Sequence, residues 1–133
     1  MLNAAARLVF SANRSAHTTP LLHEIHWLRV PERIQFRLCV LTYRSLNGIA
    51  PQYLSEYILP ASSRSSGQQL RSTESISLLV PSTCRITIGD RAFPEDAAWA
   101  LNSLQQRVWA ASLIVSFRRE LKTCLFLKSF PVV

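Results

Sequence analysis

The sequence predicts a mainly helical fold, a small helical bundle with one short β-hairpin or extended segment near residues 76–89. Three observations favour helices. Apolar residues recur at helical spacing through most of the chain. Proline stands at the start of three of the periodic segments, at Pro20, Pro31 and Pro94, and only 3 glycines interrupt them. The 133 residues are 48% hydrophobic and 17% charged, which suits one buried core.

The first two helices are predicted over residues 2–12 and from Thr19 onward. A polar break at residues 13–18 separates them, and Thr19-Pro20 is typical of a helix start, with a capping hydroxyl before a proline in the first turn. Each helix has one apolar face at helical spacing. The expected inward residues are Leu2, Ala6, Val9 and Phe10 in the first helix, and Leu21, Leu22, Ile25 and Leu28 in the second.

The helix from Pro31 to Leu46 is predicted to be the centre of the domain. Glu32 in its first turn is favourable to the helix dipole, and Asn47-Gly48 supplies a stop. The helix is apolar on two sides, which is typical of a helix packed between neighbours. One stripe holds Ile34, Leu38 and Leu41, and the other holds Phe36, Val40 and Tyr43.

The rest of the chain is expected to be less regular. A short helix begins at Pro51 and completes the N-terminal part, residues 1–59, while residues 60–75 are Ser-rich and aperiodic, as in a flexible linker. Residues 76–133 then hold the hairpin, a helix over residues 94–104, a loop-like run and a last helix from about Ser112. The two parts would form one domain or two loosely packed halves. The inward stripe of the last helix is expected to be Leu113, Ile114, Phe117, Leu121, Cys124 and Leu125.

The charge of the chain favours an anionic partner. It has 15 Lys and Arg against 8 Asp and Glu, a net charge of +7, and 13 of the 15 are arginine. Arginine binds phosphate in a bidentate manner, so RNA or DNA is the expected partner, with GC-rich coding as the alternative source of the bias. Arg33, Arg37 and Arg44 fall within about 40° of one another on their helix, at 100° per residue. The candidate nucleic-acid-binding residues are these three with Arg118, Arg119 and Lys122; a solvated helix face is the alternative for both groups.

No catalytic, metal or cofactor site is predicted. The three cysteines have no CxxC spacing and are expected to be free thiols. His23 and His26 miss the i, i+4 spacing of an HExxH zinc site. Polymerases hold two metal ions with paired aspartates, whereas Asp90 and Asp96 stand apart. We therefore expect no enzymatic activity from this chain. The cysteines are Cys39, Cys84 and Cys124.

The apolar surplus favours a second kind of partner, another protein or a second copy of the chain. The candidate interface residues are His26, Trp27, Trp99 and Trp109. No apolar run approaches about 20 residues, so no membrane-spanning helix is expected. The expected location is intracellular, in the nucleus or cytoplasm. The opening residues, with Arg7 and Arg14 and no acid before Glu24, also match a mitochondrial leader, although an ordinary helix is preferred.

Short runs along the whole chain resemble one protein family. Residues 3–9 read NAAARLV, residues 19–22 and 25–28 read TPLL and IHWL, and residues 43–46 read YRSL. Further runs are VP at 80–81, GDRAF at 89–93, NSL at 102–104, SFR at 116–118 and LKT at 121–123. In this order they resemble the region beyond the polymerase core of reverse transcriptases from non-LTR (LINE-type) retrotransposons. The chain departs from the family pattern at Arg29 and Gln105, where the family has proline, and in the position of Trp99.

The resemblance implies a non-catalytic C-terminal fragment of such a reverse transcriptase. Its partner would be the polymerase core of the parent protein, if that core is encoded upstream, and it would pack behind the palm and thumb and help to hold template and nascent DNA. On its own it would bind RNA or DNA weakly and without sequence preference. The alternatives are a protein-interaction or assembly module, and a pseudogene product without a selected role.

Overall fold

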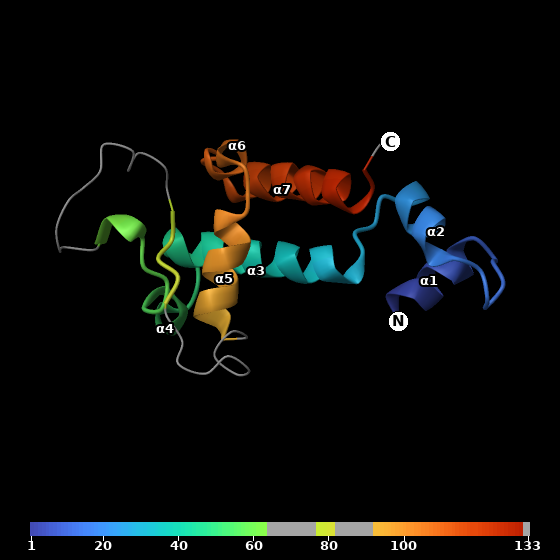
Figure 1. The fold of residues 1–133 in the computed structure, drawn as a ribbon, viewed down its shortest axis with the longest axis horizontal. Helices are drawn as coiled ribbons and strands as arrows, with labels where there is room; N and C mark the ends of the chain where they lie inside the picture. The colour runs from blue at the N-terminus through green and yellow to red at the C-terminus, as the bar shows by residue number, and fades with distance from the viewer. Residues whose placement is uncertain (64–76, 82–91, 132–133) are drawn as a thin grey trace. The chain divides into compact units, whose positions relative to one another are not determined.

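The computed structural model describes residues 1–63, 77–81 and 92–131 (Figure 1). These residues form α-helices and one 3-10 turn at Ala61–Ser63, with no named strand in the described ranges. The predicted helical class is confirmed. None of these helices combines the length and the apolar character that a membrane crossing requires. The helices are α1 (Leu2–Val9), α2 (Thr18–Glu24), α3 (Val30–Leu46), α4 (Gln52–Ser55), α5 (Phe93–Asn102), α6 (Gln106–Trp109) and α7 (Ile114–Ser129).

The contacts divide the chain into two compact units. Unit 1 holds Met1–Phe36 and Arg119–Val133, so it joins segments from both ends of the sequence. Unit 2 holds Arg37–Arg118. Both α3 and α7 contribute residues to each unit. The linker predicted over residues 60–75 lies outside the described residues from position 64 onward.

In unit 1, α1 packs against α2 (Figure 1). The buried centre of this unit is made of Ala6, Leu22 and Phe130. Ala6 has no exposed surface, and its small side chain allows the two helices to approach closely. Most residues predicted to face inward do so, but Val9 is 63% exposed because α1 ends at this residue. The partly buried residues around the centre are Leu2, Leu21, Ile25, Trp27 and Phe126.

Three helices end in the same way, with a Schellman motif. The residue after the C-cap adopts left-handed backbone, and the next N–H group bonds to the carbonyl five residues earlier. The left-handed residues are Ser11 (φ 49°), His26 (φ 53°) and Gly48 (φ 68°). The closing bonds run from Ala12 N to Arg7 O at 2.9 Å, from Trp27 N to Leu22 O at 2.9 Å, and from Ile49 N to Arg44 O at 2.8 Å. Gly48 was predicted as a stop, but serine and histidine rarely adopt this conformation, so the sequence did not predict it at Ser11 or His26. The turn at Ser11 makes the first helix shorter than the predicted range 2–12.

Three other boundaries differ from the prediction. α2 begins at Thr18 with His17 as its N-cap, so Pro20 is the third helical residue, whose missing N–H removes no intrahelical bond. α4 is a single turn that ends at Ser55. The run at residues 105–112, expected to be a loop, contains α6, whose Val108 is 3% exposed. The gain from burying this valine explains why a helical turn forms there.

The most deeply buried side chains of α3 include small residues that belong to neither of the two predicted apolar stripes, and Ile34, in the first stripe, is exposed. Cys39 and Thr42 have no exposed surface, while Ile34 is 58% exposed. The Thr42 hydroxyl donates to the Leu38 carbonyl at 2.7 Å. In the same way, the Ser45 hydroxyl donates to the Leu41 carbonyl at 2.9 Å. Because their hydrogen bonds are satisfied within the helix, these small polar side chains can be buried. A pattern built on apolar residue types alone does not detect such a face.

In unit 2, Tyr43 joins α3 to α7 and to the segment before it. Its ring stacks on that of Phe117 with centroids 4.2 Å apart, and its hydroxyl donates to the Ala111 carbonyl at 2.8 Å. Phe117 begins the buried stripe of α7, which continues along the helix at Leu121 and Leu125 as predicted. Leu113, predicted to lie in this stripe, is 66% exposed because the helix begins after it.

The side chain of Asn102 holds the described segment 77–81 against the end of α5. Leu78 N donates to Asn102 Oδ1, and Asn102 Nδ2 donates to the Leu78 carbonyl, both at 2.9 Å. Leu78 is 4% exposed and forms an isolated antiparallel bridge with Pro60. This extended backbone lies where a hairpin or extended segment was predicted. The remainder of that prediction, residue 76 and residues 82–89, lies outside the described residues.

The Tyr43–Phe117 stack should dominate the stability of unit 2. Phe117→Ala removes a fully buried ring, and we expect the free energy of unfolding to fall by about 3–5 kcal/mol. Leu113→Ala, at an exposed position on the same segment, is the matched control and should change it by less than about 0.5 kcal/mol. Urea unfolding followed by circular dichroism measures both, and equal losses would contradict the assignment.

The left-handed residue after α1 offers a test of backbone strain. Ser11→Gly removes the steric cost of a Cβ at φ 49°, and we expect about 0.5–1 kcal/mol of added stability. Ser15→Gly is the control, because Ser15 is also exposed and has no positive φ. That control should lose a few tenths of a kcal/mol through added freedom of the unfolded chain. Thermal melts of the two variants compare them directly.

Candidate functional site

The exposed side of α3 presents the three arginines predicted to bind nucleic acid. Arg33, Arg37 and Arg44 are all exposed, and helical periodicity places them on the side opposite Cys39 and Thr42, which are fully buried. Arg33 belongs to unit 1, and the other two belong to unit 2. Among the interactions of the described residues, no hydrogen bond or ion pair involves these three guanidinium groups. They are therefore open to an external anion.

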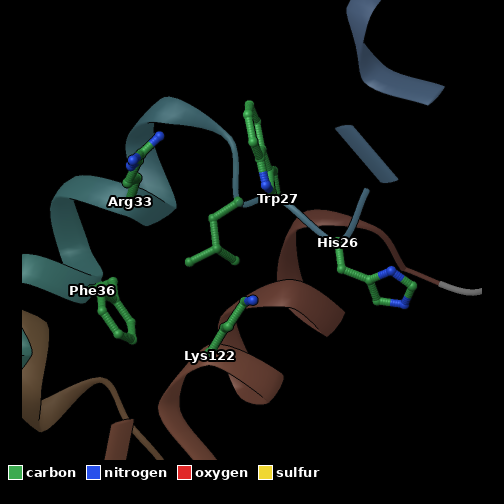
Figure 2. Close-up of a pocket in the computed structure, with 6 residues that line it drawn as sticks. His26, Trp27, Arg33, Phe36 and Lys122 are labelled. Atoms are coloured by element: carbon green, nitrogen blue, oxygen red, sulfur yellow. The ribbon is translucent and has the colours of Figure 1, made fainter. Parts of the chain in front are cut away.

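Unit 1 contains a small basic pocket that brings together four of the predicted site residues. Arg33 and Lys122 line it together with His26 and Trp27. Leu28 and Phe36 complete its wall. Figure 2 shows Arg33 and Phe36 projecting from α3, Lys122 from α7, and Trp27 and His26 from the segment that precedes α3. The volume of the pocket is about 200 Å³.

The pocket combines charge with apolar surface. Its two cationic side chains are exposed, while Trp27 and Phe36 are half-buried and Leu28 is buried. The described residues that line it include no acid. Such a combination suits a ligand with a flat ring and a negative charge.

Arg118 and Arg119, the other predicted basic residues, are exposed on α7. Neither lines the basic pocket. As neighbours in a helix they point about 100° apart, so they do not act as a pair on one phosphate. Lys122 is thus the member of the predicted α7 group that the structure brings to the pocket.

Sequence reasoning missed a cluster of aromatic side chains beside the pocket. The His26 ring stacks on Phe126 with centroids 5.3 Å apart, and His23 contacts the same ring at 5.5 Å. Phe130 meets His23 edge-on at 5.1 Å, and the Arg29 guanidinium lies over Phe130 at 4.9 Å from its centroid. The signal in the sequence was the spacing of Phe126 and Phe130, which are four residues apart at the end of α7. The cluster holds the segment before α3 against the end of α7.

The tryptophans predicted as interface residues have different surroundings. Trp27 packs against the buried centre of unit 1. In unit 2, Trp99 is 69% exposed, whereas Trp109 is half-buried and its Nε1 donates to the Leu101 carbonyl at 3.1 Å. Trp109 therefore has a structural contact of its own, and Trp99 is the tryptophan open to a partner.

The described part of the chain offers no constellation for metal chemistry. No group of three His, Cys, Asp or Glu side chains comes together within it. Asp96 is in the first turn of α5, and Asp90 lies outside the described residues. Cys39 is buried and Cys124 is half-buried, and neither is in a disulfide bond. No protein-family model, no curated protein and no solved structure matches this chain.

The different roles of two tryptophans are testable. Trp109→Phe removes the indole N–H that donates to the Leu101 carbonyl, which keeps the Leu104 N–H as a donor at 3.0 Å, and we expect a loss of about 0.5–1.5 kcal/mol in the free energy of unfolding. Trp99→Phe, at the exposed position in the same unit, should change it by less than about 0.5 kcal/mol. Chemical unfolding monitored by circular dichroism gives both values. A larger effect at Trp99 would contradict the assignment.

Proposed function

We propose that this chain is a non-catalytic C-terminal segment of a non-LTR retrotransposon reverse transcriptase and that it binds RNA or DNA weakly and without sequence preference. The observation that supports binding most directly is the exposed arginine side of α3, formed by Arg33, Arg37 and Arg44. The family origin rests on the ordered series of sequence runs. Its partners would be nucleic acid and the polymerase core of a parent protein, in the nucleus or cytoplasm.

The expected affinity follows from the number of available cations. From Arg33 to Arg44 the helix rises by about 16 Å, so the three guanidinium groups follow the line of a nucleic-acid backbone rather than one phosphate. Each neutralised phosphate contributes about 0.7–0.9 to the slope of log K against log salt. Three contacts therefore predict roughly a 20- to 40-fold loss of affinity between 50 and 200 mM salt. Such binding is sequence-independent because phosphate contacts carry no base information.

The proposed role assigns the polymerase chemistry to another part of the parent protein. Phosphoryl transfer by a polymerase requires two metal ions held by neighbouring carboxylates. Asp96 is exposed at the start of α5, and the described residues place no second aspartate beside it. The contribution of this segment would be to hold the nucleic acid near the polymerase.

A protein-interaction module is the second candidate, and exposed apolar residues of unit 2 favour it. Trp99, Leu113 and Val115 are 69%, 66% and 74% exposed. Sedimentation velocity over a hundredfold range of concentration distinguishes the two functions. Self-association that Trp99→Ala abolishes would support the module, and a monomer at every concentration would argue against self-assembly. A sample without a cooperative melt would instead indicate a decayed copy without a selected role.

The binding proposal predicts a salt-dependent titration. Labelled single-stranded RNA and DNA, titrated with the full chain at 50 and 200 mM salt, should both bind at the lower salt and weaken steeply at the higher one. Arg37→Gln and Arg44→Gln should each lower the salt slope by about 0.7–0.9. Lys128→Gln, an exposed cation at the end of α7 outside the candidate set, is the charge-matched control and should have a smaller effect. Absence of binding at low salt, or binding that salt leaves unchanged, would refute the proposal.

A further inference from the structure

We infer that the basic pocket of unit 1 holds one unstacked base of a single-stranded nucleic acid, with the adjoining phosphate on Arg33 and Lys122. This inference rests on the proposed nucleic-acid binding and adds to it a strand type and a binding site. The proposed function alone requires only charge. The pocket adds aromatic and apolar surface at the place where two of those charges meet.

The size of the pocket limits what it can hold. Its volume of about 200 Å³ is below the range of roughly 300–1,000 Å³ typical of sites for drug-sized ligands. One flat ring system therefore fits, and a larger part of a strand must stay outside. Buried Leu28 supplies apolar wall, and the half-buried rings of Trp27 and Phe36 supply π surface. Stacking of this kind tolerates every base, because every base has a π face.

The two cations provide the site for the phosphate. Arg33 and Lys122 come from different helices, and both are exposed at the pocket (Figure 2). The side chain of neither residue makes a hydrogen bond or an ion pair within the described ranges. Two other basic residues of unit 1 are already engaged: Arg7 donates to the Ala16 carbonyl at 3.1–3.2 Å, and Arg29 lies over the Phe130 ring. With no acid among the described lining residues, the charge of the pocket is complementary to an anion.

Contacts around the pocket hold Trp27 and His26 in position before a ligand binds. The left-handed residue His26 ends α2, and the N–H of Trp27 is held by the Leu22 carbonyl at 2.9 Å. The His26 ring is held in turn by stacking on Phe126. A wall fixed in this way loses little conformational freedom when a ligand binds, which favours affinity.

A strand with free bases fits this site, and a duplex does not. In a duplex the bases are stacked and paired, so only their edges are accessible in the grooves. Unstacked bases of a single strand can be splayed out onto aromatic side chains. The pocket should therefore distinguish a single strand from a duplex of equal length, which the exposed arginines alone do not.

The test compares three ligands and four variants of the full chain at low salt. The ligands are a labelled single-stranded 12-mer, the duplex of the same length, and a 12-mer of abasic sites that keeps its phosphates. Phe36→Leu should weaken single-strand binding about tenfold, equivalent to ~1.4 kcal/mol, and should leave duplex and abasic binding within about twofold. Arg33→Gln and Lys122→Gln should weaken single-strand binding and lower its salt slope by about 0.7 each. Arg44→Gln, on the same helix but outside the pocket, should weaken single-strand and duplex binding alike.

The outcomes separate this inference from the proposed function. If neither strand nor duplex binds at low salt, both fail. If both bind, and the pocket variants weaken strand and duplex by the same factor as Arg44→Gln, the pocket assignment is overturned while electrostatic binding stands. Thermal melts verify that Phe36→Leu is folded. Arg33→Gln and Lys122→Gln, at exposed positions, test the pocket independently of the Phe36 ring. Adenosine monophosphate that displaces the 12-mer at equal concentration would assign the pocket to a free nucleotide. Polyglutamate that does so would show that the pocket recognises charge alone, and either displacement overturns the inference.

Discussion

The contacts of Tyr43 determine which way α3 faces. The stack on Phe117 at 4.2 Å and the hydroxyl bond to Ala111 at 2.8 Å attach one side of the helix to residues far along the chain. Cys39 and Thr42 share that side and have no exposed surface. With this side committed to the interior, the opposite side must be solvated, and arginine is well suited to it. The availability of Arg37 and Arg44 to a ligand therefore follows from the packing of a tyrosine.

A second constraint acts in unit 1, where a histidine adopts a conformation usual for glycine. His26, at φ 53°, follows Ile25, the C-cap residue of α2, and turns the chain toward α3. A strained residue of this kind persists only where its surroundings hold it in place. Here the ring stacks on Phe126, and the following N–H bonds to Leu22. The turn places Trp27 beside Arg33, so the conformation of one residue brings the aromatic and cationic sides of the basic pocket together.

The two proposed modes of nucleic-acid contact differ in their physics and complement each other. The arginine side of α3 offers charge spread along a helix, which attracts a polyanion and is screened by salt. The basic pocket offers a confined apolar surface whose contribution is less sensitive to salt. The arginines would contact the phosphates of a strand, and the basic pocket would contact one base. Such contacts suit a segment that retains template or product near a polymerase without performing chemistry.

Local features of the sequence were enough to predict the helices other than α6, the extent of α3 to within one residue, and the exposure of its arginines. They depend on proline, on Gly48 and on helical periodicity, all of which act within a few residues. The buried side of α3 was not predictable, because Thr42 and Ser45 are buried through bonds to their own helix, and residue type does not reveal this. The left-handed conformation of His26 was hidden for a similar reason, since its cost is offset by contacts with residues distant in the sequence. Lys122 was predicted to bind phosphate, but its place beside Trp27 and Arg33 was decided by the tertiary structure. Periodicity fixes directions along one helix, and only packing between distant segments decides which side chains share a pocket.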